Sequence, residues 1–198
     1  MLERIRVAVL EEVRIRGIKF TMDDLSLRLG MSKKTLYKYY KSKDRLIADV
    51  VDYLVIDIKK QRKEISLDES ISCIQKLKAH FEYRPYSNLK RSNNSALADL
   101  KKYYPEEWDK FEQLRKESLD EMVFLLDKCI EEGTVRHLNT RVAATMIVAT
   151  LGELLNNDEF LRENNWSPMT SVQVTLDMVF HGILSDNQKE LKRSESNL

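Results

Sequence analysis

The 198-residue sequence predicts an all-α protein, and three observations support this fold class. Glycine and proline, which the turns of β-rich folds require, occur 5 and 3 times. Apolar residues recur at helical spacing along most of the chain, with charged residues between them. Hydrophobic residues make up 42% and charged residues 33%, which is typical of a soluble globular protein. We therefore expect about nine helices in total.

Four of these helices are expected within the first sixty residues. The first occupies residues 2–16, where apolar side chains recur every four positions and a glycine follows. The second begins at a capping box at Thr21 and ends at Gly30, whose freedom to adopt a positive φ suits a sharp turn. Ser32 caps a third short helix, and Ser42 caps a longer fourth helix.

The second and third helices, joined by the turn "LGMS", have the pattern of a helix-turn-helix, whose second helix enters the major groove of DNA. Leu36 and Tyr40 are expected to face the core, although the other tyrosines could also be core residues and the lysines ordinary solvated surface. Outward lysines and hydroxyls suit phosphate oxygens and base edges, and Thr21 and Lys43 flank this surface. The expected DNA-binding residues are Thr21, Ser32, Lys33, Lys34, Thr35, Tyr37, Lys38, Tyr39 and Lys43.

The charge distribution agrees with an anionic partner for the first third of the chain. Residues 1–60 contain 14 Lys and Arg against 9 Asp and Glu, a balance of +5. The whole chain has 33 and 32, so the other 138 residues contain 19 against 23, a balance of −4. A positive excess of this size is also common on ordinary solvated surfaces. The charge balance alone therefore does not identify a DNA-binding site, and the residue pattern has to distinguish the two.

Residues 17–46, "GIKFTMDDLSLRLGMSKKTLYKYYKSKDRL", resemble the N-terminal DNA-binding domain of the TetR family of bacterial transcriptional regulators. The Phe-Thr pair, the Leu-Gly turn, the Ser-Lys-x-Thr-Leu-Tyr run and the closing Lys-Ser-Lys are all in register. Lys34 departs from the family, which usually has glycine or another small residue there, so operator preference cannot be carried over. Tyr40 stands where phenylalanine is commoner, which is a mild change at a core position.

The resemblance implies a helical C-terminal domain that binds an effector and dimerises. Further helices are expected at about 66–81, 95–103, 105–132, 140–156 and 170–185. The domain limits that follow are residues 1–46 for DNA binding, with the fourth helix at about 43–63 as the link. Residues 47–190 then form the effector-binding and dimerisation domain. Residues 191–198 are expected to be a disordered tail.

The last two expected helices suit a homodimer, because in the family such a pair packs against its copy across a two-fold axis. A two-fold protein also places two recognition helices on a palindromic DNA site. Burial within one subunit is the alternative for this apolar surface. The expected interface residues are Val142, Met146, Ala149, Leu154, Val172, Leu176, Val179, Phe180 and Ile183.

A helical domain of this kind can enclose a cavity lined by aromatic residues and methionines, with a few polar contacts. Each of the candidates could instead be plain core. The candidate effector-binding residues are Phe81, Tyr86, Trp108, Phe111, Arg115, Met122, Leu126, His137 and Met146.

No pattern of catalysis emerges, and we expect neither an enzyme, nor a metal site, nor a cofactor. The three histidines lie on separate segments, and the sequence has no phosphate-binding loop or nucleophile elbow. Cys73 and Cys129 are too few and too far apart for a disulfide framework, so both are expected to be buried thiols. The chain also lacks an apolar stretch long enough to span a membrane, and we expect it to be cytoplasmic.

These observations lead to a dimeric transcriptional regulator, most simply a repressor that a small-molecule effector releases from a palindromic operator. A second hypothesis is an architectural or cell-division protein with the same DNA-binding domain, no small-molecule effector and control by a protein partner. That hypothesis predicts a filled C-terminal core. A helical enzyme with an accessory DNA-binding segment would need convergent titratable groups, which the sequence does not show.

Overall fold

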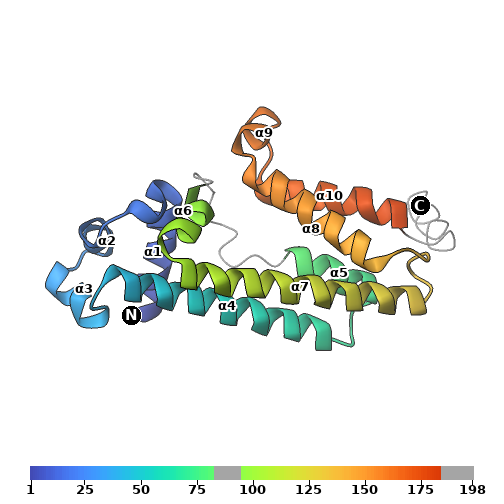
Figure 1. Ribbon diagram of the computed structural model, residues 1–198, viewed down its shortest axis with the longest axis horizontal. Helices are drawn as coiled ribbons and strands as arrows, with labels where there is room; N and C mark the ends of the chain where they lie inside the picture. The colour runs from blue at the N-terminus through green and yellow to red at the C-terminus, as the bar shows by residue number, and fades with distance from the viewer. Residues whose placement is uncertain (83–94, 184–198) are drawn as a thin grey trace. The chain divides into compact units, whose positions relative to one another are not determined.

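The computed structural model describes residues 1–82 and 95–183, and every regular element in these ranges is a helix (Figure 1). The α-helices are α1 (Leu2–Arg16), α2 (Met22–Leu29), α3 (Lys33–Tyr39), α4 (Lys43–Leu67), α5 (Cys73–Glu82), α6 (Ser95–Tyr103), α7 (Pro105–Glu131), α8 (Thr140–Asn156), α9 (Asp158–Glu163) and α10 (Pro168–Ile183). A short 3-10 helix, η1 (Gly17–Lys19), follows α1. The predicted all-α class is confirmed. The expected tail at 191–198 lies outside the described residues.

The chain forms two compact units. The first unit comprises Met1–Lys59 and Pro85–Leu114, and the second unit comprises Lys60–Arg84 and Arg115–Leu198. Two long helices, α4 and α7, each contribute residues to both units. The first unit is larger than the expected DNA-binding domain because α6 and the start of α7 pack with the N-terminal helices.

The core of the first unit is built from apolar side chains of α1, α2, α3, α4 and α6. Ile5, Leu25, Leu36 and Leu46 come from four different helices, and each has 0% exposure. Leu100 of α6 is buried in the same cluster. Full burial of each such side chain contributes about 1.5–3 kcal/mol, so this core fixes the mutual positions of α1 to α4 in the first unit.

Local signals set both ends of α2 as the sequence predicts. The Thr21 hydroxyl accepts a hydrogen bond from Asp24 N at 3.1 Å, and Thr21 N donates to Asp24 Oδ2 at 2.8 Å, which completes a capping box. At the other end, Gly30 adopts a left-handed conformation with φ 64°. Its N–H donates to Leu27 O at 3.1 Å. Glycine is suited to this turn because it has no Cβ to oppose a positive φ.

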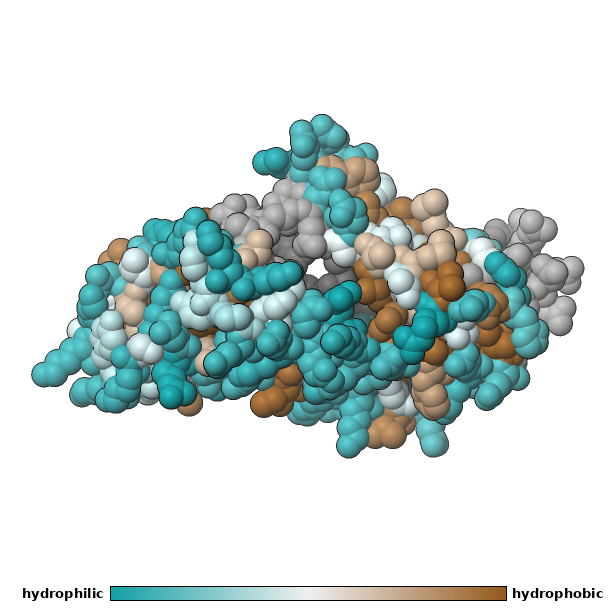
Figure 2. Space-filling view, in the orientation of Figure 1, coloured by the Kyte–Doolittle hydropathy of each residue, from teal (hydrophilic) through white to brown (hydrophobic). Residues whose placement is uncertain are grey.

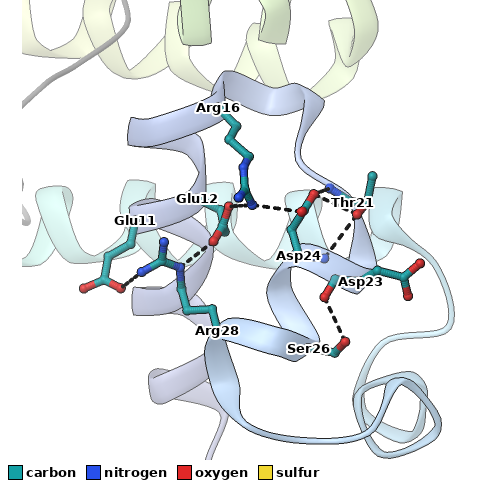
Figure 3. A network of polar contacts seen from close by, with 8 residues as sticks. All are labelled: Glu11, Glu12, Arg16, Thr21, Asp23, Asp24, Ser26 and Arg28. Atoms are coloured by element: carbon teal, nitrogen blue, oxygen red, sulfur yellow. Dashed lines mark hydrogen bonds and ion pairs between the residues drawn. The ribbon is translucent and has the colours of Figure 1, made fainter.

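A buried carboxylate joins α1 to α2 (Figure 3). The Glu12 side chain is 2% exposed and accepts from Arg28 Nε at 2.5 Å and from Arg16 Nη1 at 2.8 Å. Each arginine also contacts a second carboxylate. Arg16 Nη1 lies 2.9 Å from Asp24 Oδ1, and Arg28 Nη1 lies 3.0 Å from Glu11 Oε2. A buried carboxylate is tolerated only when it is paired in this way, so Glu12 depends on both arginines.

A second ion pair joins α1, the end of α3 and α4. Arg6 donates to both oxygens of Asp49 at 2.8 Å, and its guanidinium lies 4.5 Å from the centre of the Tyr53 ring. The Tyr40 hydroxyl donates to Asp49 Oδ2 at 2.6 Å. Arg6 and Tyr40 hold the pKa of Asp49 below its ordinary value, whereas burial, with Asp49 beside it, raises the pKa of Tyr40 to about 12. Tyr40 is therefore a core residue with a bonded hydroxyl.

The core of the second unit lies between α5, α7, α8 and α10. Leu77, Leu126, Ala144, Val172 and Phe180 are among its most deeply buried residues. Helix α10 packs against α8 and also contacts α5. Apolar side chains on several sides of α8 thus find partners within the second unit.

The start of α5 differs from the expectation. The sequence predicts this helix from Ser66, but α4 continues to Leu67 and α5 begins at Cys73. Ser72 forms a capping box there, in which Ser72 N donates to Gln75 Oε1 at 2.7 Å and Gln75 N donates to Ser72 Oγ at 3.3 Å. This local signal at Ser72 and Gln75 marks the true beginning of α5.

Helix α9 was not predicted from the sequence. Asn157 caps it by accepting from Phe160 N at 3.0 Å, and an Asp-Glu pair follows in its first turn. The cap and the acidic pair are a standard helix start, but six residues are too few to show helical periodicity. Helix α10 begins at Pro168, two residues before the expected start.

The two cysteines correct an expectation. Cys73 of α5 and Cys129 of α7 were predicted to be separate buried thiols, but they form a disulfide with a Cα–Cα distance of 5.6 Å. Burial was predicted correctly, since their exposures are 6% and 0%. The pairing was missed because 56 residues separate them in the sequence, whereas helix packing makes them neighbours.

Replacement of Glu12 by glutamine should destabilise the protein by about 2 kcal/mol, because the change removes the negative charge that two arginines share in a buried position. The matched change of Glu11 to glutamine should cost less than about 1 kcal/mol, since Glu11 is half-exposed and contacts Arg28 alone. Urea denaturation followed by circular dichroism measures both values. Equal losses for the two variants would contradict the assigned importance of Glu12.

The stability contributed by Asp49 should depend on pH. Its pKa is lowered in the folded state, so its contribution is complete above the unfolded pKa of about 3.9 and is lost as the pH falls through the folded value. The difference in unfolding free energy between the wild type and the Asp49→Asn variant should therefore be largest at neutral pH and shrink below about pH 4. Urea titrations between neutral and acidic pH test this, and a constant difference would contradict it.

Candidate functional site

The outward face of α3 forms the candidate DNA-binding surface. Ser32 caps this helix by accepting from Thr35 N at 3.1 Å. Leu36, with 0% exposure, and Tyr40, with 7%, anchor the helix to the core. The opposite face is left to solvent, and its lysines are Lys33, Lys34 and Lys38.

Two tyrosines of α3 lie at the edge of this surface. Tyr37 is partly buried and packs against the core of the first unit, whereas Tyr39 is 42% exposed. Thr35 is also partly buried, and its hydroxyl lies 2.8 Å from Ser32 Oγ. The surface therefore offers three ammonium groups together with several hydroxyls, which suits contacts with phosphates and base edges.

Lys33 has a partner within the protein. Its ammonium lies 2.8 Å from an oxygen of Asp23 on α2, and this hydrogen bond raises the pKa of Lys33. Both side chains are more than half exposed, and exposed pairs of this kind contribute little to stability. A phosphate could therefore replace Asp23. Asp23 was not among the predicted site residues, because nothing in the sequence shows that it faces Lys33.

The hydroxyl of Thr21 is already engaged. It donates to Asp24 Oδ2 at 2.8 Å while it accepts from Asp24 N. The hydrogen bonds that the Thr21 backbone N–H and then its hydroxyl donate to the Asp24 carboxylate lower the pKa of Asp24. Thr21 is exposed, so it lies at the surface as predicted, but its hydroxyl would have to leave Asp24 before it could donate to a phosphate.

Lys43 has a different position from the one expected. Its ammonium donates to the backbone carbonyl of Ile18 and lies 4.5 Å from the centre of the Phe20 ring. Burial lowers the pKa of Lys43. This lysine therefore ties η1 to the start of α4 rather than extending into solvent, and we leave it out of the proposed DNA contacts.

The candidate effector-binding residues that the structure describes fall in both units rather than in one. Trp108 and Phe111 pack against the core of the first unit, whereas Met122 and Leu126 are buried in the core of the second unit. The side chain of Phe81 and the whole of Tyr86 lie outside the described residues. The remaining candidates are exposed, and these are Arg115, His137 and Met146.

A polar cluster that the sequence did not reveal lies in the second unit, where His80 and Ser118 are buried and Glu121 is exposed. Arg62 of α4 donates to the hydroxyl of Ser118 on α7. His80 of α5 is 4% exposed, and its Nε2 lies 3.7 Å from a carboxylate oxygen of Glu121. Burial, together with Arg62, lowers the pKa of His80 to about 4, so His80 is neutral at physiological pH. The sequence did not predict this cluster, because its residues lie on three separate helices.

The expected dimer residues have mixed exposure. Val142 and Met146 of α8 are 53% and 64% exposed, and Met178 of α10, which was not predicted, is 72% exposed. Figure 2 shows hydrophobic residues in brown gathered over α8 and α10. The side chain of Ile183 is not described. The other side chains range from exposed Ala149 through half-buried Leu154 and Val179 to buried Val172, Leu176 and Phe180.

Two other kinds of site are absent from the described part of the chain. Residues 1–82 and 95–183 contain no group of three or more His, Cys, Asp or Glu side chains that could hold a metal ion. No helix in the same ranges is long and apolar enough to cross a membrane.

The DNA-binding surface corresponds to a known family of domains. Residues 10–50 match the family model described as bacterial regulatory proteins of the tetR family. These residues include all of α2 and α3, so the match covers α3, the helix that carries the exposed lysines Lys33, Lys34 and Lys38.

Similarity to known proteins extends over almost the whole chain. An uncharacterized HTH-type transcriptional regulator, YvaF of Bacillus subtilis strain 168, is 27% identical over 188 residues, which cover 95% of this chain and 98% of that protein. The structure of the TetR family regulator PfmR from Thermus thermophilus matches with a TM-score of 0.69 and 17% identity, over 90% of this chain and 97% of that one.

A third similar protein was solved with a ligand. The transcriptional regulator FadR from Bacillus subtilis in complex with stearoyl-CoA has a TM-score of 0.65 and 18% identity, over 92% of this chain and 100% of that one. Identities this low show that the fold is shared. The matched family model places a DNA-binding domain of the tetR type at residues 10–50, and the chain as a whole is similar to transcriptional regulators that share this fold.

Proposed function

We propose that this regulator is a homodimeric repressor that binds palindromic DNA through α3 and is released by a small-molecule effector bound in the second unit. The observation that carries the proposal is the face of α3, where Lys33, Lys34 and Lys38 point to solvent while Leu36 and Tyr40 anchor the helix. Such a regulator works where the bacterial chromosome is, in the cytoplasm.

In the DNA step, α3 enters the major groove and its lysines contact phosphates and guanine acceptors. Tyr37 is held against the core, so its hydroxyl can donate to a phosphate from a fixed position. When DNA binds, the Lys33 ammonium leaves the Asp23 carboxylate and contacts a phosphate instead. The contribution of Lys33 to DNA affinity therefore depends on how well the phosphate competes with that carboxylate. The contact set is completed by Ser32, Lys34, Thr35, Lys38 and Tyr39, with Thr21 at its border.

In the assembly, α8 and α10 of two copies cover one another's exposed apolar side chains. Val142, Met146 and Met178 are each more than half exposed, which is unusual for large apolar residues gathered over two neighbouring helices. A second copy of the chain is the partner that fits, because a two-fold dimer presents two α3 helices to the two halves of a palindrome.

In the effector step, a ligand in the second unit favours a dimer in which the α3 helices have another separation. Support comes from FadR, a protein of the same fold that was solved with stearoyl-CoA. Helices α4 and α7 have residues in both units, so they can carry a change from one unit to the other. A tenfold loss of DNA affinity requires about 1.4 kcal/mol of difference between the ligand's affinities for the two states.

Within the second unit, the polar cluster supplies groups that could orient a ligand. Arg62, Ser118 and Glu121 offer a cation, a hydroxyl and a carboxylate beside the neutral ring of His80. A few polar groups at the edge of an apolar core are expected to give a binding site its specificity, and here they range from the buried His80 to the exposed Glu121.

A second candidate function is an architectural or cell-division protein that has no small-molecule effector and responds to a protein partner. Met122 and Leu126, two of the expected cavity residues, are 2% and 0% exposed within a packed core, which favours this alternative. Native mass spectrometry separates the two functions. A purified dimer with additional small-molecule mass supports the repressor with an effector, whereas a bare dimer that binds DNA irrespective of added metabolites supports the alternative.

Changes on the outward face of α3 should weaken binding to a DNA sequence selected from a random library. Lys34→Ala should lower affinity by about tenfold and reduce the salt slope of binding by roughly 1, because one phosphate contact is lost. Tyr37→Phe keeps the packing and should cost about fivefold through loss of one hydrogen bond. Fluorescence anisotropy at several salt concentrations measures both. Lys116→Ala, on the exposed surface of α7, is the control, and affinities equal to that control would remove these residues from the interface.

A charge on the apolar surface of α8 should disrupt the dimer. Met146→Glu should raise the dimer dissociation constant by at least about a hundredfold, because a buried carboxylate without a partner is costly at an interface. Ile56→Glu is the matched control, since Ile56 is 66% exposed on α4 and lies in the first unit. Sedimentation equilibrium measures both. Unchanged dimerisation of the Met146→Glu variant would place the interface elsewhere.

A further inference from the structure

The disulfide between Cys73 and Cys129 has no role in the function proposed so far. Cys73 is the first residue of α5, and Cys129 lies in the last turn of α7. These are the two cysteines of the whole chain, and they are bonded to each other. The bond therefore ties two helices of the second unit that otherwise meet through apolar packing.

A permanent disulfide is unexpected in a DNA-binding regulator. Bacterial DNA lies in the cytoplasm, where thiol couples keep most cysteine pairs reduced, and disulfides that form there are usually transient and regulatory. The core around this pair is already closely packed, with Leu77, Leu125 and Leu126 each at most 4% exposed. The packing thus gives the unit a hydrophobic core that does not depend on the covalent bond.

We propose that Cys73 and Cys129 are a reversible redox site, at which a low-molecular-weight disulfide oxidises the pair and a thiol reduces it, and that this state tunes DNA binding. The regulatory part rests on the proposed function. In oxidation, the Cys73 thiolate attacks one sulfur of the small disulfide and releases one thiolate. The Cys129 thiolate then attacks the Cys73 sulfur and releases the second. Two electrons pass to the small disulfide, and the two cysteine protons end on the two released thiols.

The order of these steps follows from the positions of the two sulfurs. Cys73 is slightly exposed, at 6%, whereas Cys129 is fully buried. Cys73 is also at the first position of a ten-residue helix, where the helix dipole favours a thiolate. Cys73 is therefore the attacking cysteine and Cys129 the resolving one.

Access to Cys73 requires a small local opening. The turn before α5 is exposed at Asp68, Glu69, Ser70 and Ser72, and the capping box between Ser72 and Gln75 holds the first turn of the helix. Helix ends open at lower free-energy cost than the core, so fraying of this turn would admit a small thiol or disulfide. The core around Cys129 need not unfold.

The state of the bond matters because it limits how far the start of α5 can move from the end of α7. An effector that binds among the helices of the second unit must displace some of them. The disulfide prevents one of these displacements, the movement of the start of α5 away from the end of α7. Helix α7 also contributes residues to the first unit. We therefore expect the oxidised and reduced proteins to differ in affinity for their selected DNA sequence.

The test begins with a redox titration of the full-length protein in glutathione buffers, with a maleimide reagent to count free thiols and circular dichroism to monitor folding. A reversible transition between two folded forms supports the site. Reduction that occurs only on unfolding, or a pair that does not re-form, overturns it.

The second measurement is DNA affinity after treatment with dithiothreitol or with oxidised glutathione. We expect at least about a threefold difference for the wild type and none for Cys73→Ser or Cys129→Ala, two variants that also control for a local effect of either substitution. Equal affinity of both wild-type forms overturns the regulatory inference while leaving the proposed repressor intact. If neither the oxidised nor the reduced form binds any selected DNA, that result would instead contradict the proposed function.

Discussion

The proposed DNA recognition depends on α3, a helix too short to be stable in water without its neighbours. Helix α3 has seven residues, whereas isolated helices shorter than about 12–15 residues are marginal in water. Its conformation therefore comes from the Ser32 cap and from two anchors, Leu36 in the core and Tyr40 hydrogen-bonded to Asp49. Because those anchors occupy one face, the lysines are held on the other. The positive charge of the candidate DNA-binding surface is thus held outward because the opposite face of α3 is buried.

Helix α1 contributes to this arrangement although it has no expected DNA contact. One of its residues, Arg6, binds Asp49 on α4, and another, Glu12, binds Arg28 on α2. Both pairs are at least partly sheltered from water, where a charge without its partner is costly. The ion pairs of α1 therefore orient the two helices on either side of the recognition helix. Lys43 has a similar structural role, because its ammonium closes the junction between η1 and α4.

The second unit concentrates its unusual chemistry along α5 and α7. The disulfide lies at one end of α5, and the buried His80 lies farther along α5, near Ser118 and Glu121 of α7 and Arg62 of α4. The proposed effector response and the proposed redox response would consequently act on the same helix packing. A bond that restrains α5 against α7 would change the free-energy cost of admitting a ligand, so the two signals would be coupled rather than independent.

The sequence by itself determined most of the helices, the caps of α2 and α3 and the helix-turn-helix segment, because these depend on interactions between residues at most four positions apart. Thr21 and Gly30 bound α2 for this reason, and the outward lysines of α3 followed from the helical period. Tertiary structure alone decided which distant groups meet. It turned Lys43 inward, paired Lys33 with Asp23, divided the expected cavity residues between two cores and joined Cys73 to Cys129. Contacts across tens of residues leave no local signal, since they arise from how helices pack.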